Sequence, residues 1–254
     1  MSRPGIGRSI LASLRFLTVL PVPMGRSAAA PDAGMTTAVF PLAGLVIGLL
    51  LLPLAFLPVD PFVRSALILA AWIALTGGLH EDGWIDAMDA VLAPVDRQRR
   101  LEILKDPRVG AHGLTALLCL VFLRFGALVS VPAAALVAAP VVGRWTMVLS
   151  LARFPALRAE GLGATFADGA RPFAAGILAG AVLIPLAALV SSAWPVVVWV
   201  VGTTAGLVMG RFLTGRLGGL NGDGHGAVGL LAETACLVAW SMAPTSLGWG
   251  SWSG

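Results

Sequence analysis

Apolar and polar residues follow one another along this chain in long blocks. Each apolar block is about 20 residues long, the length at which a helix crosses the hydrocarbon core of a bilayer. The blocks cover residues 38–57, 62–79, 114–131, 133–149, 173–190, 195–213 and 227–244. Helices satisfy their own backbone polar groups in lipid. The pattern therefore predicts an all-α fold, a polytopic integral membrane helix bundle with about seven spans.

The first 35 residues have a different character. Residues 8–20 mix arginines with bulky apolar side chains and end at Pro21 and Pro23. Such a composition is typical of a helix that lies in the headgroup plane of a membrane. We therefore expect residues 1–35 to form an N-terminal interfacial segment of a single membrane-embedded domain, residues 1–254.

Composition supports contact with lipid. The 254 residues are 57% hydrophobic and 12% charged, whereas an ordinary soluble domain is about 25% charged. The mean hydropathy is +0.90. Although the net charge is +4, the basic residues are scattered singly through short loops. The sequence therefore indicates a membrane partner and no nucleic acid.

The basic residues also predict the orientation. If seven spans begin from an inner N-terminus, all but three of the 17 basic residues lie on the inner side. Of the three, Arg64 lies in an outer loop, and Arg124 and Arg144 fall within spans. Because Lys and Arg are enriched in cytoplasmic loops, we expect a cytoplasmic N-terminus and long polar loops on the cytoplasmic side.

An acidic stretch, TGGLHEDGWIDAMDA, ends the second apolar block. In a helix Asp82, Asp86 and Asp89 lie at i, i+4 and i+7 and share one face, and Glu81 points elsewhere. Three like charges on one face need a cation, and oxygen ligands suit a hard divalent ion such as Mg²⁺. A solvated acidic loop is the alternative. His80 adjoins the aspartates and is expected to orient a ligand or substrate oxygen.

Two further polar loops carry groups suited to metal and phosphate. In LKDPRVGAHG, Asp106 offers an oxygen ligand, and Lys105 and Arg108 offer contacts to phosphate. In GGLNGDGHG, Asp223 lies among five glycines and offers another oxygen ligand. A charged interfacial turn and a flexible loop are the alternative interpretations.

Arg124, Arg144 and Glu233 are charged and lie well inside predicted spans. A charge at the centre of a membrane helix costs about 2.5–3.5 kcal/mol on insertion scales, so we expect these residues to face a shared polar interior. Snorkelling to a nearby interface is the alternative. Arginines beside an aspartate-bound ion would neutralise phosphate oxygens, which predicts an anionic, chelating substrate.

Several of these motifs resemble one known family. GGLHEDGWIDAMDA, LKDPRVGAHG, ARFPALRAEGLGATFA and RLGGLNGDGHGA occur in the order and approximate spacing found in the cobalamin synthase family, the adenosylcobinamide-GDP ribazoletransferases. The opening RFLTVLPVP is similar to the N-terminal signature of that family. Glu81, Asn221 and the pair Gly229–Leu230 depart from the family pattern.

The resemblance implies a Mg²⁺-dependent, multi-pass enzyme of the bacterial inner membrane with its active site facing the cytoplasm. Its substrates are adenosylcobinamide-GDP and α-ribazole or its 5′-phosphate, and the reaction releases GMP in the last assembly step of cobalamin (vitamin B12) biosynthesis. A homo-oligomer is compatible with the resemblance.

Residue by residue, the resemblance matches His80, Asp82, Asp86 and Asp89 to one family motif. It matches Asp106, Arg108 and Gly110 to a second, and Gly222 with Asp223 to a third. On this basis we expect Asp82, Asp86, Asp89 and Asp223 to bind metal. Asp89 is the predicted proton acceptor and Asp106 the second choice. Phosphate contacts are predicted for Lys105, Arg108 and Arg144.

Two other functions stay open at this point. A CDP-alcohol phosphotransferase of phospholipid synthesis also uses several aspartates at helical spacing, although the acidic stretch of this chain lacks the Ala-Arg pair and the longer gap before the later aspartates that mark that signature. An ion-coupled transporter could use the intramembrane arginines and Glu233.

Overall fold

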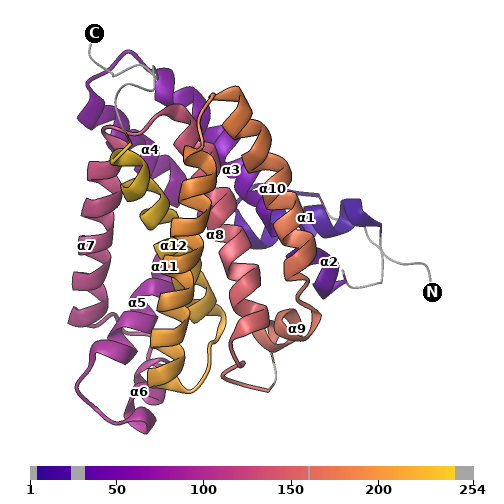
Figure 1. Cartoon of the computed structure of the whole chain (residues 1–254). Coiled ribbons are helices and arrows are strands. Elements are labelled where there is room, and N and C mark those ends of the chain that lie inside the picture. Colours follow the sequence, from indigo (N-terminus) through magenta and orange to yellow (C-terminus); the bar gives the residue numbers. More distant parts are fainter. Residues whose placement is uncertain (1–4, 24–31, 160, 244–254) are drawn as a thin grey trace.

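The computed structural model describes residues 5–23, 32–159 and 161–243. This part of the chain is helical and has no strand, only a backbone bridge between Ala156 and Leu220, so the all-α prediction is confirmed (Figure 1). The helices are α1 (Ile6–Leu17), α2 (Ala33–Ala38), α3 (Phe40–Leu51), the 3-10 helix η1 (Leu52–Phe56), α4 (Pro61–Thr76), α5 (Leu79–Leu92), α6 (Arg97–Ile103), α7 (Ala111–Leu128), α8 (Ala133–Arg153), α9 (Leu162–Gly169), α10 (Pro172–Leu189), α11 (Trp194–Leu217) and α12 (Gly222–Ser241).

Several of these helices could cross a membrane. Four described helices, α7, α8, α10 and α11, are long and apolar enough, and a fifth span results if α4 and α5 count as one broken span. The helix formed by α3 and η1 is apolar but shorter, and α12 is not among the candidates. A multi-pass protein is therefore confirmed, and the count of seven spans and the cytoplasmic N-terminus stay predictions.

The chain bends sharply between α4 and α5. Gly77 and Gly78 both adopt left-handed backbone conformations, with φ of 65° and 69°. A side chain at either position would be strained there, so two consecutive glycines permit the turn. The axes of α4 and α5 differ by 87°. The bend ends the apolar helix and starts the acidic one at Leu79.

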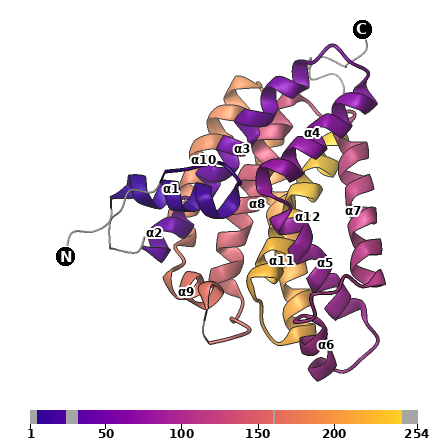
Figure 2. The ribbon, with the colours of Figure 1, turned by 180° about the vertical axis from the view of Figure 1, so that it is seen from behind.

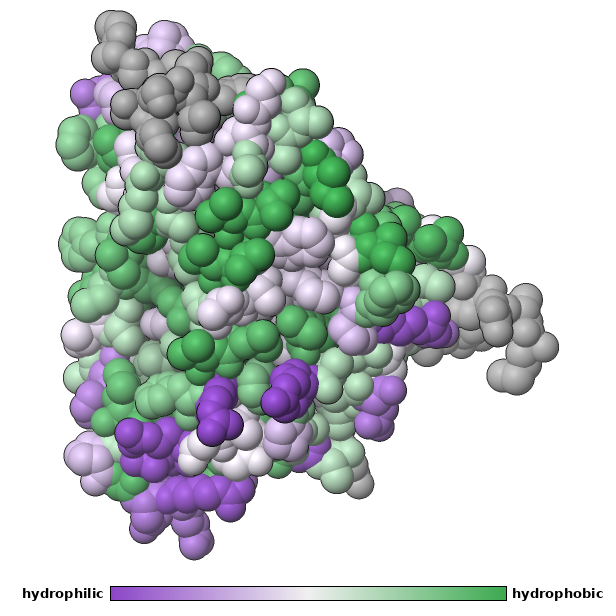
Figure 3. Space-filling model, viewed as in Figure 1, coloured by the Kyte–Doolittle hydropathy of each residue, from purple (hydrophilic) through white to green (hydrophobic). Residues whose placement is uncertain are grey.

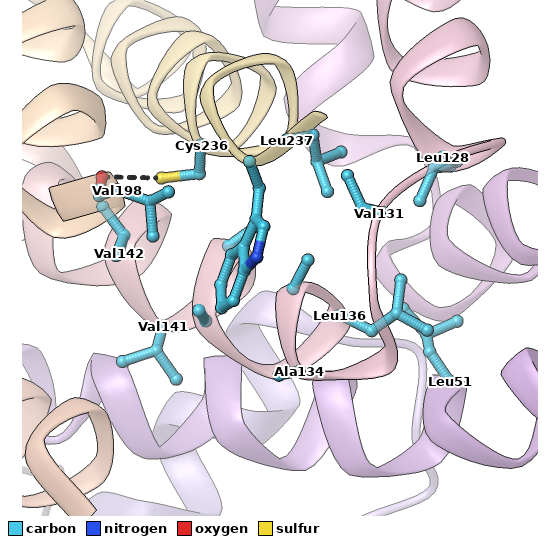
Figure 4. Packing of buried hydrophobic residues seen from close by; sticks show 14 of the residues in the cluster. Leu51, Leu128, Val131, Ala134, Leu136, Val141, Val142, Val198, Cys236 and Leu237 are labelled. Carbon is cyan, nitrogen blue, oxygen red and sulfur yellow. Dashed lines mark hydrogen bonds between the residues drawn. The ribbon is translucent and has the colours of Figure 1, made fainter. Parts of the chain in front are cut away.

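The core is built around α8, which lies between α3, α10, α11 and α12. Of its most apolar 18-residue window, 83% is buried, against 28% for α7. In Figure 4 side chains from α8 meet Leu237 and Cys236 of α12, and the Cys236 thiol donates to the Val198 carbonyl at 3.2 Å. Interior packing thus surrounds α8, and α7 stays at the edge of the bundle.

The link between α7 and α8 is very short, and a link of this length predicts that two helices pack as an antiparallel pair, but this prediction is wrong for α7 and α8. Helix α7 packs instead against α4, α5 and α12. Figures 1 and 2 show α7 standing apart from α8 on the outside of the bundle. Although α7 and α8 are neighbours in sequence, α7 packs where it covers polar groups of α5 and α12.

The two ends of the molecule differ in polarity. Figure 3 shows hydrophobic side chains over most of the visible face and hydrophilic ones at the end where α6 lies in Figure 1. Helix α6 contributes Arg97, Arg99 and Arg100. At one side α1 packs on α2 and α3. The interfacial role of residues 1–35 stays a prediction, and residues 1–4 and 24–31 of that segment lie outside the described residues.

Candidate active site at the amino ends of α5 and α12

The acidic stretch is helical, as expected, and forms α5. Its three aspartates differ in environment along the helix: Asp82 is exposed, Asp86 is half-buried, and Asp89 is buried with 7% of its surface exposed. Glu81 points away from them into the bundle and is also buried. Asp82 and Asp86 are therefore the two members of the predicted set that solvent and substrate can reach from α5.

Asp223 reaches the same place from the start of α12. Asn221 caps this helix by accepting a bond from the Gly224 N–H at 2.9 Å, and its amide donates to Asp223 Oδ2 at 2.6 Å. Gly83 of α5 lies directly against the Asp223 backbone: a Cβ added to Gly83 would be 2.9 Å from the Asp223 Cα. Because Gly83 has no side chain, Asp223 can sit beside the Asp82–Asp86 face.

The four aspartates influence one another electrostatically. The charges of Asp82, Asp223 and Asp89 all act on Asp86. Burial raises the pKa of Asp223, and the Asp82 charge acts in the same direction, whereas the Asn221 hydrogen bond and the Arg158 charge oppose the rise. A cluster of carboxylates that repel one another is stabilised by a bound cation. The electrostatics therefore favour a cation at the junction of α5 and α12.

The donor set fits Mg²⁺ chemically but is not a closed cage. No three His, Cys, Asp or Glu side chains of the described residues are arranged to hold a metal ion by themselves. Mg²⁺ usually binds one or two carboxylates and completes its octahedron with water and substrate phosphates. Asp82, Asp86 and Asp223 supply hard oxygen donors of this kind beside an open hollow of about 570 Å³ bordered by Asp82 and the Gly77–Gly78 turn.

Asp89 has a different partner from the one predicted. Its two oxygens accept the backbone N–H groups of Gly110 at 2.7 Å and Gly113 at 2.8 Å. These donors belong to the first turn of α7, where unpaired N–H groups and the helix dipole attract a carboxylate. The geometry argues against Asp89 as metal ligand and proton acceptor and gives it the role of fastening α7 to α5.

The LKDPRVGAHG loop does not turn its charges toward the acidic cluster. Arg108 donates to Asp106 at 2.6 Å, and its side chain is 85% exposed. The hydrogen bonds from Arg108 lower the pKa of Asp106 to about 2. So weak a base is unsuited to accept a proton at neutral pH, which argues against Asp106 as the second choice. Lys105 is exposed next to this pair.

Arg144 lies in the interior and contacts no solvent. It forms an ion pair with Glu233 of α12. Arg124 of α7 binds the other Glu233 oxygen at 3.2 Å, lies 3.9 Å from Glu81 and stacks over Trp72. The expected polar interior therefore exists, but its arginines are neutralised by carboxylates. The predicted contact between Arg144 and substrate phosphate has no support in this burial.

Sequence reasoning missed the residues that hold the site loops together. Leu157 donates to the Leu220 carbonyl at 2.8 Å, and Leu220 donates to Pro155 at 2.9 Å, so two loops far apart in sequence pair side by side. This pairing brings Arg158 close enough for its charge to act on Asp223. The residue spacing within either loop does not predict this contact, and only the parallel bridge between Ala156 and Leu220 reveals it.

His80 is placed as the sequence indicated, beside the aspartates at the start of α5. The side chain is 3% exposed, and its Nε2 has no hydrogen-bond partner among the described residues. A buried nitrogen of this kind normally has a partner. His80 is thus available to a polar atom of a bound molecule.

Comparison with known proteins agrees with the motif analysis. Residues 9–241 match the model of the family described as cobalamin-5-phosphate synthase. Three similar proteins carry the name adenosylcobinamide-GDP ribazoletransferase. They come from Roseiflexus sp. (37% identity, 89% of this chain and 86% of the relative), Stutzerimonas stutzeri (37%, 90% and 96%) and Deinococcus radiodurans (36%, 93% and 87%). No solved structure gives a significant match. From the ordered motifs and the match over nearly its whole length, the chain belongs to the cobalamin-5-phosphate synthase family.

Proposed function

We propose that this protein is an adenosylcobinamide-GDP ribazoletransferase that acts at a membrane in the last step of cobalamin synthesis. The observation that carries the proposal is the similarity over about nine-tenths of the chain to relatives that bear this name. The acidic junction of α5 and α12 supports it, because carboxylates and cations around a diphosphate are what phosphoryl transfer requires.

In the proposed reaction a hydroxyl of the ribazole ribose attacks the phosphorus next to cobinamide. A new P–O bond forms, the P–O bond to the second phosphate breaks, and GMP leaves with the bonding electrons. Mg²⁺ held by Asp82, Asp86 and Asp223 would neutralise charge on the diphosphate. These aspartates come from two helices that Gly83 holds in contact, so their spacing is fixed before substrate binds.

The proton of the attacking hydroxyl needs an acceptor near Asp223. We assign it to His80, because its Nε2 is buried and unpaired among the described residues and the side chain borders the same cavity as Asp223. Burial and the charges of Arg144 and Arg124 hold the pKa of His80 well below its usual value, so the imidazole is neutral at pH 7 and one of its ring nitrogens can accept a proton. Asp89 and Asp106 are engaged by α7 and by Arg108 instead.

Cations around the cluster would bind the donor's phosphates. Arg158 acts on Asp223 through its charge and is exposed. Lys105 and Arg108 are exposed on the loop before α7, where Arg108 would exchange Asp106 for phosphate. We also propose that this face lies on the cytoplasmic side of a bacterial inner membrane, because loops rich in Lys and Arg are enriched on that side.

The test uses the whole chain, purified in lipid, with adenosylcobinamide-GDP and α-ribazole, with and without Mg²⁺. The expected result, in the presence of Mg²⁺ only, is a corrinoid that contains ribazole and is lighter than the donor, because the GMP that leaves is heavier than the ribazole that enters, together with one GMP for each corrinoid formed. Release of CMP from a CDP-alcohol with no activity on adenosylcobinamide-GDP would contradict the proposal, as would transport of a corrinoid into sealed vesicles without covalent change.

A further inference from the structure

A partly open cavity lies beside the acidic cluster. It has a volume of about 220 Å³ and is bordered by α1, α3, α5, α8 and α9 and by the start of α12. Asp223 belongs to both the cavity wall and the proposed metal site. A molecule in the cavity therefore lies next to the reacting groups.

Aromatic rings form one side of this cavity. Phe16 of α1, Phe40 of α3 and Phe166 of α9 come together from three separate parts of the chain. The Phe166 ring stands edge-on to the other two, with centroids 5.3 Å from Phe16 and 5.9 Å from Phe40, and Phe16 stacks on Phe40 at 6.0 Å. Rings in such arrangements provide faces and edges for a further flat ring. This side of the cavity suits an aromatic ligand.

Polar side chains also border the cavity. His80 and His225 border it together with Asp223. His225 uses its Nδ1 in a 2.7 Å hydrogen bond with Ser150, whereas Nε2 of His80 has no partner among the described residues. A buried unpaired nitrogen indicates a missing polar partner. The wall of the cavity thus combines aromatic rings with hydrogen-bonding groups, among them Asp223.

The size and lining of the cavity determine which part of the two substrates it can bind. An apolar cavity of about 150 Å³ accommodates benzene, so 220 Å³ suffices for a fused two-ring base. Guanine would leave several donors and acceptors unpaired against phenyl, leucine and methionine side chains, which is unfavourable. An apolar two-ring base does not have this set of donors and acceptors, so its burial there avoids that cost.

We propose that this cavity binds the aromatic base of the nucleoside acceptor, with the attached ribose directed toward His80 and Asp223. The inference rests on the proposed function and adds to it the place of one substrate. In this arrangement the ring lies among Phe16, Phe40 and Phe166, and a ribose hydroxyl meets the unpaired nitrogen of His80. The adenosylcobinamide-GDP donor then approaches the aspartates from the open hollow beside Asp82.

Two variants of opposite kind test the proposal. Phe166→Ala removes a ring from the wall. Gly226→Leu fills the space, because a Cβ added to Gly226 has only His80 within 4 Å, at an ordinary 3.5 Å. Both variants are expected to raise the KM for α-ribazole by about 10-fold or more, as stacking contacts do. The KM for adenosylcobinamide-GDP is expected to stay within about two-fold.

Phe122→Ala is the control, because Phe122 lies on α7 with 69% of its surface exposed and is far from the cavity wall. Equilibrium dialysis of α-ribazole and of guanosine with the wild-type protein, without donor, gives a second reading: ribazole binds and guanosine does not. If the wild type binds ribazole through Phe166 but releases no GMP with the donor, the proposed reaction fails and the cavity assignment stands.

The cavity assignment fails if both variants fold and leave the KM for α-ribazole within about two-fold of wild type. It also fails if both variants raise only the KM for adenosylcobinamide-GDP, because that result would mean that the cavity binds the guanine base of the donor. If dialysis shows ribazole binding that neither variant weakens, the base binds elsewhere and the cavity assignment fails.

Discussion

The attachment of α7 to α5 through Asp89 gives the sharpest prediction. In Asp89→Asn one oxygen remains for one of the two N–H groups of Gly110 and Gly113, and the other N–H faces an amide NH₂. A hydrogen bond to a charged group contributes about 1.5–3 kcal/mol, and a buried unpaired N–H costs about 1–3 kcal/mol. We therefore expect a destabilisation of about 2–4 kcal/mol and, for a chain of this size, a fall in Tm of roughly 5–15 °C.

The assay pairs thermal unfolding of the purified protein with Mg²⁺-dependent GMP release, both measured on Asp89→Asn and Asp86→Asn. Asp86 is half-buried and is repelled by three neighbouring carboxylates, so its neutral variant is expected to keep or raise the Tm while losing turnover. Activity of Asp89→Asn should follow its folded fraction. A normal Tm combined with abolished turnover in Asp89→Asn would refute the fastening role and restore Asp89 as the proton acceptor.

Three further predictions concern the neighbouring contacts. Glu233→Gln leaves two buried arginines without their main counter-charge and should destabilise by about 3–5 kcal/mol; an unchanged Tm would contradict the charge network. Gly83→Ala places a Cβ 2.9 Å from the Asp223 Cα, so the backbones of α5 and α12 must separate. GMP release should therefore fall at least about 10-fold, although alanine favours a helix. Normal turnover would show that the close approach at Gly83 is not needed to position Asp223. Because burial raises the pKa of Asp223, protons should compete with Mg²⁺ more strongly as pH falls, which calorimetric Mg²⁺ titrations at several pH values can detect; an affinity independent of pH would exclude Asp223 as a ligand.

Local patterns predicted the acidic helix and the polar interior well. The i, i+4, i+7 spacing places Asp82, Asp86 and Asp89 on one face only if the segment is helical, and the segment does form a helix, α5. Charges within apolar blocks predicted a polar interior, and Arg124, Arg144 and Glu233 meet there. Both inferences depend on the cost of isolated charges, which acts at short range and can be read from spacing.

The roles of single residues could not be read in the same way. The carboxylate of Asp89 is chemically suited to bind a metal ion, and the guanidinium of Arg144 is suited to bind phosphate. In the fold, however, their partners come from α7 and α12, which lie far along the chain. The pairing of the loops around Leu157 and Leu220 likewise depends on tertiary packing. Spacing gives the face on which a residue lies, whereas the neighbour across that face is decided by the fold.

The ion pairs of Glu233 also have a consequence for the order in which the protein is made. Arg124 and Arg144 leave the ribosome before Glu233, which lies nearest the carboxyl terminus of the three. Until α12 arrives, their remaining acidic neighbour is Glu81, 3.9 Å from Arg124 in the finished fold. The charges of Arg124 and Arg144 in newly inserted α7 and α8 are thus balanced by Glu233 only after α12 has been made. A chain that ends before α12 keeps two unbalanced arginines within its membrane helices, which is unfavourable and makes it a substrate for quality-control proteases.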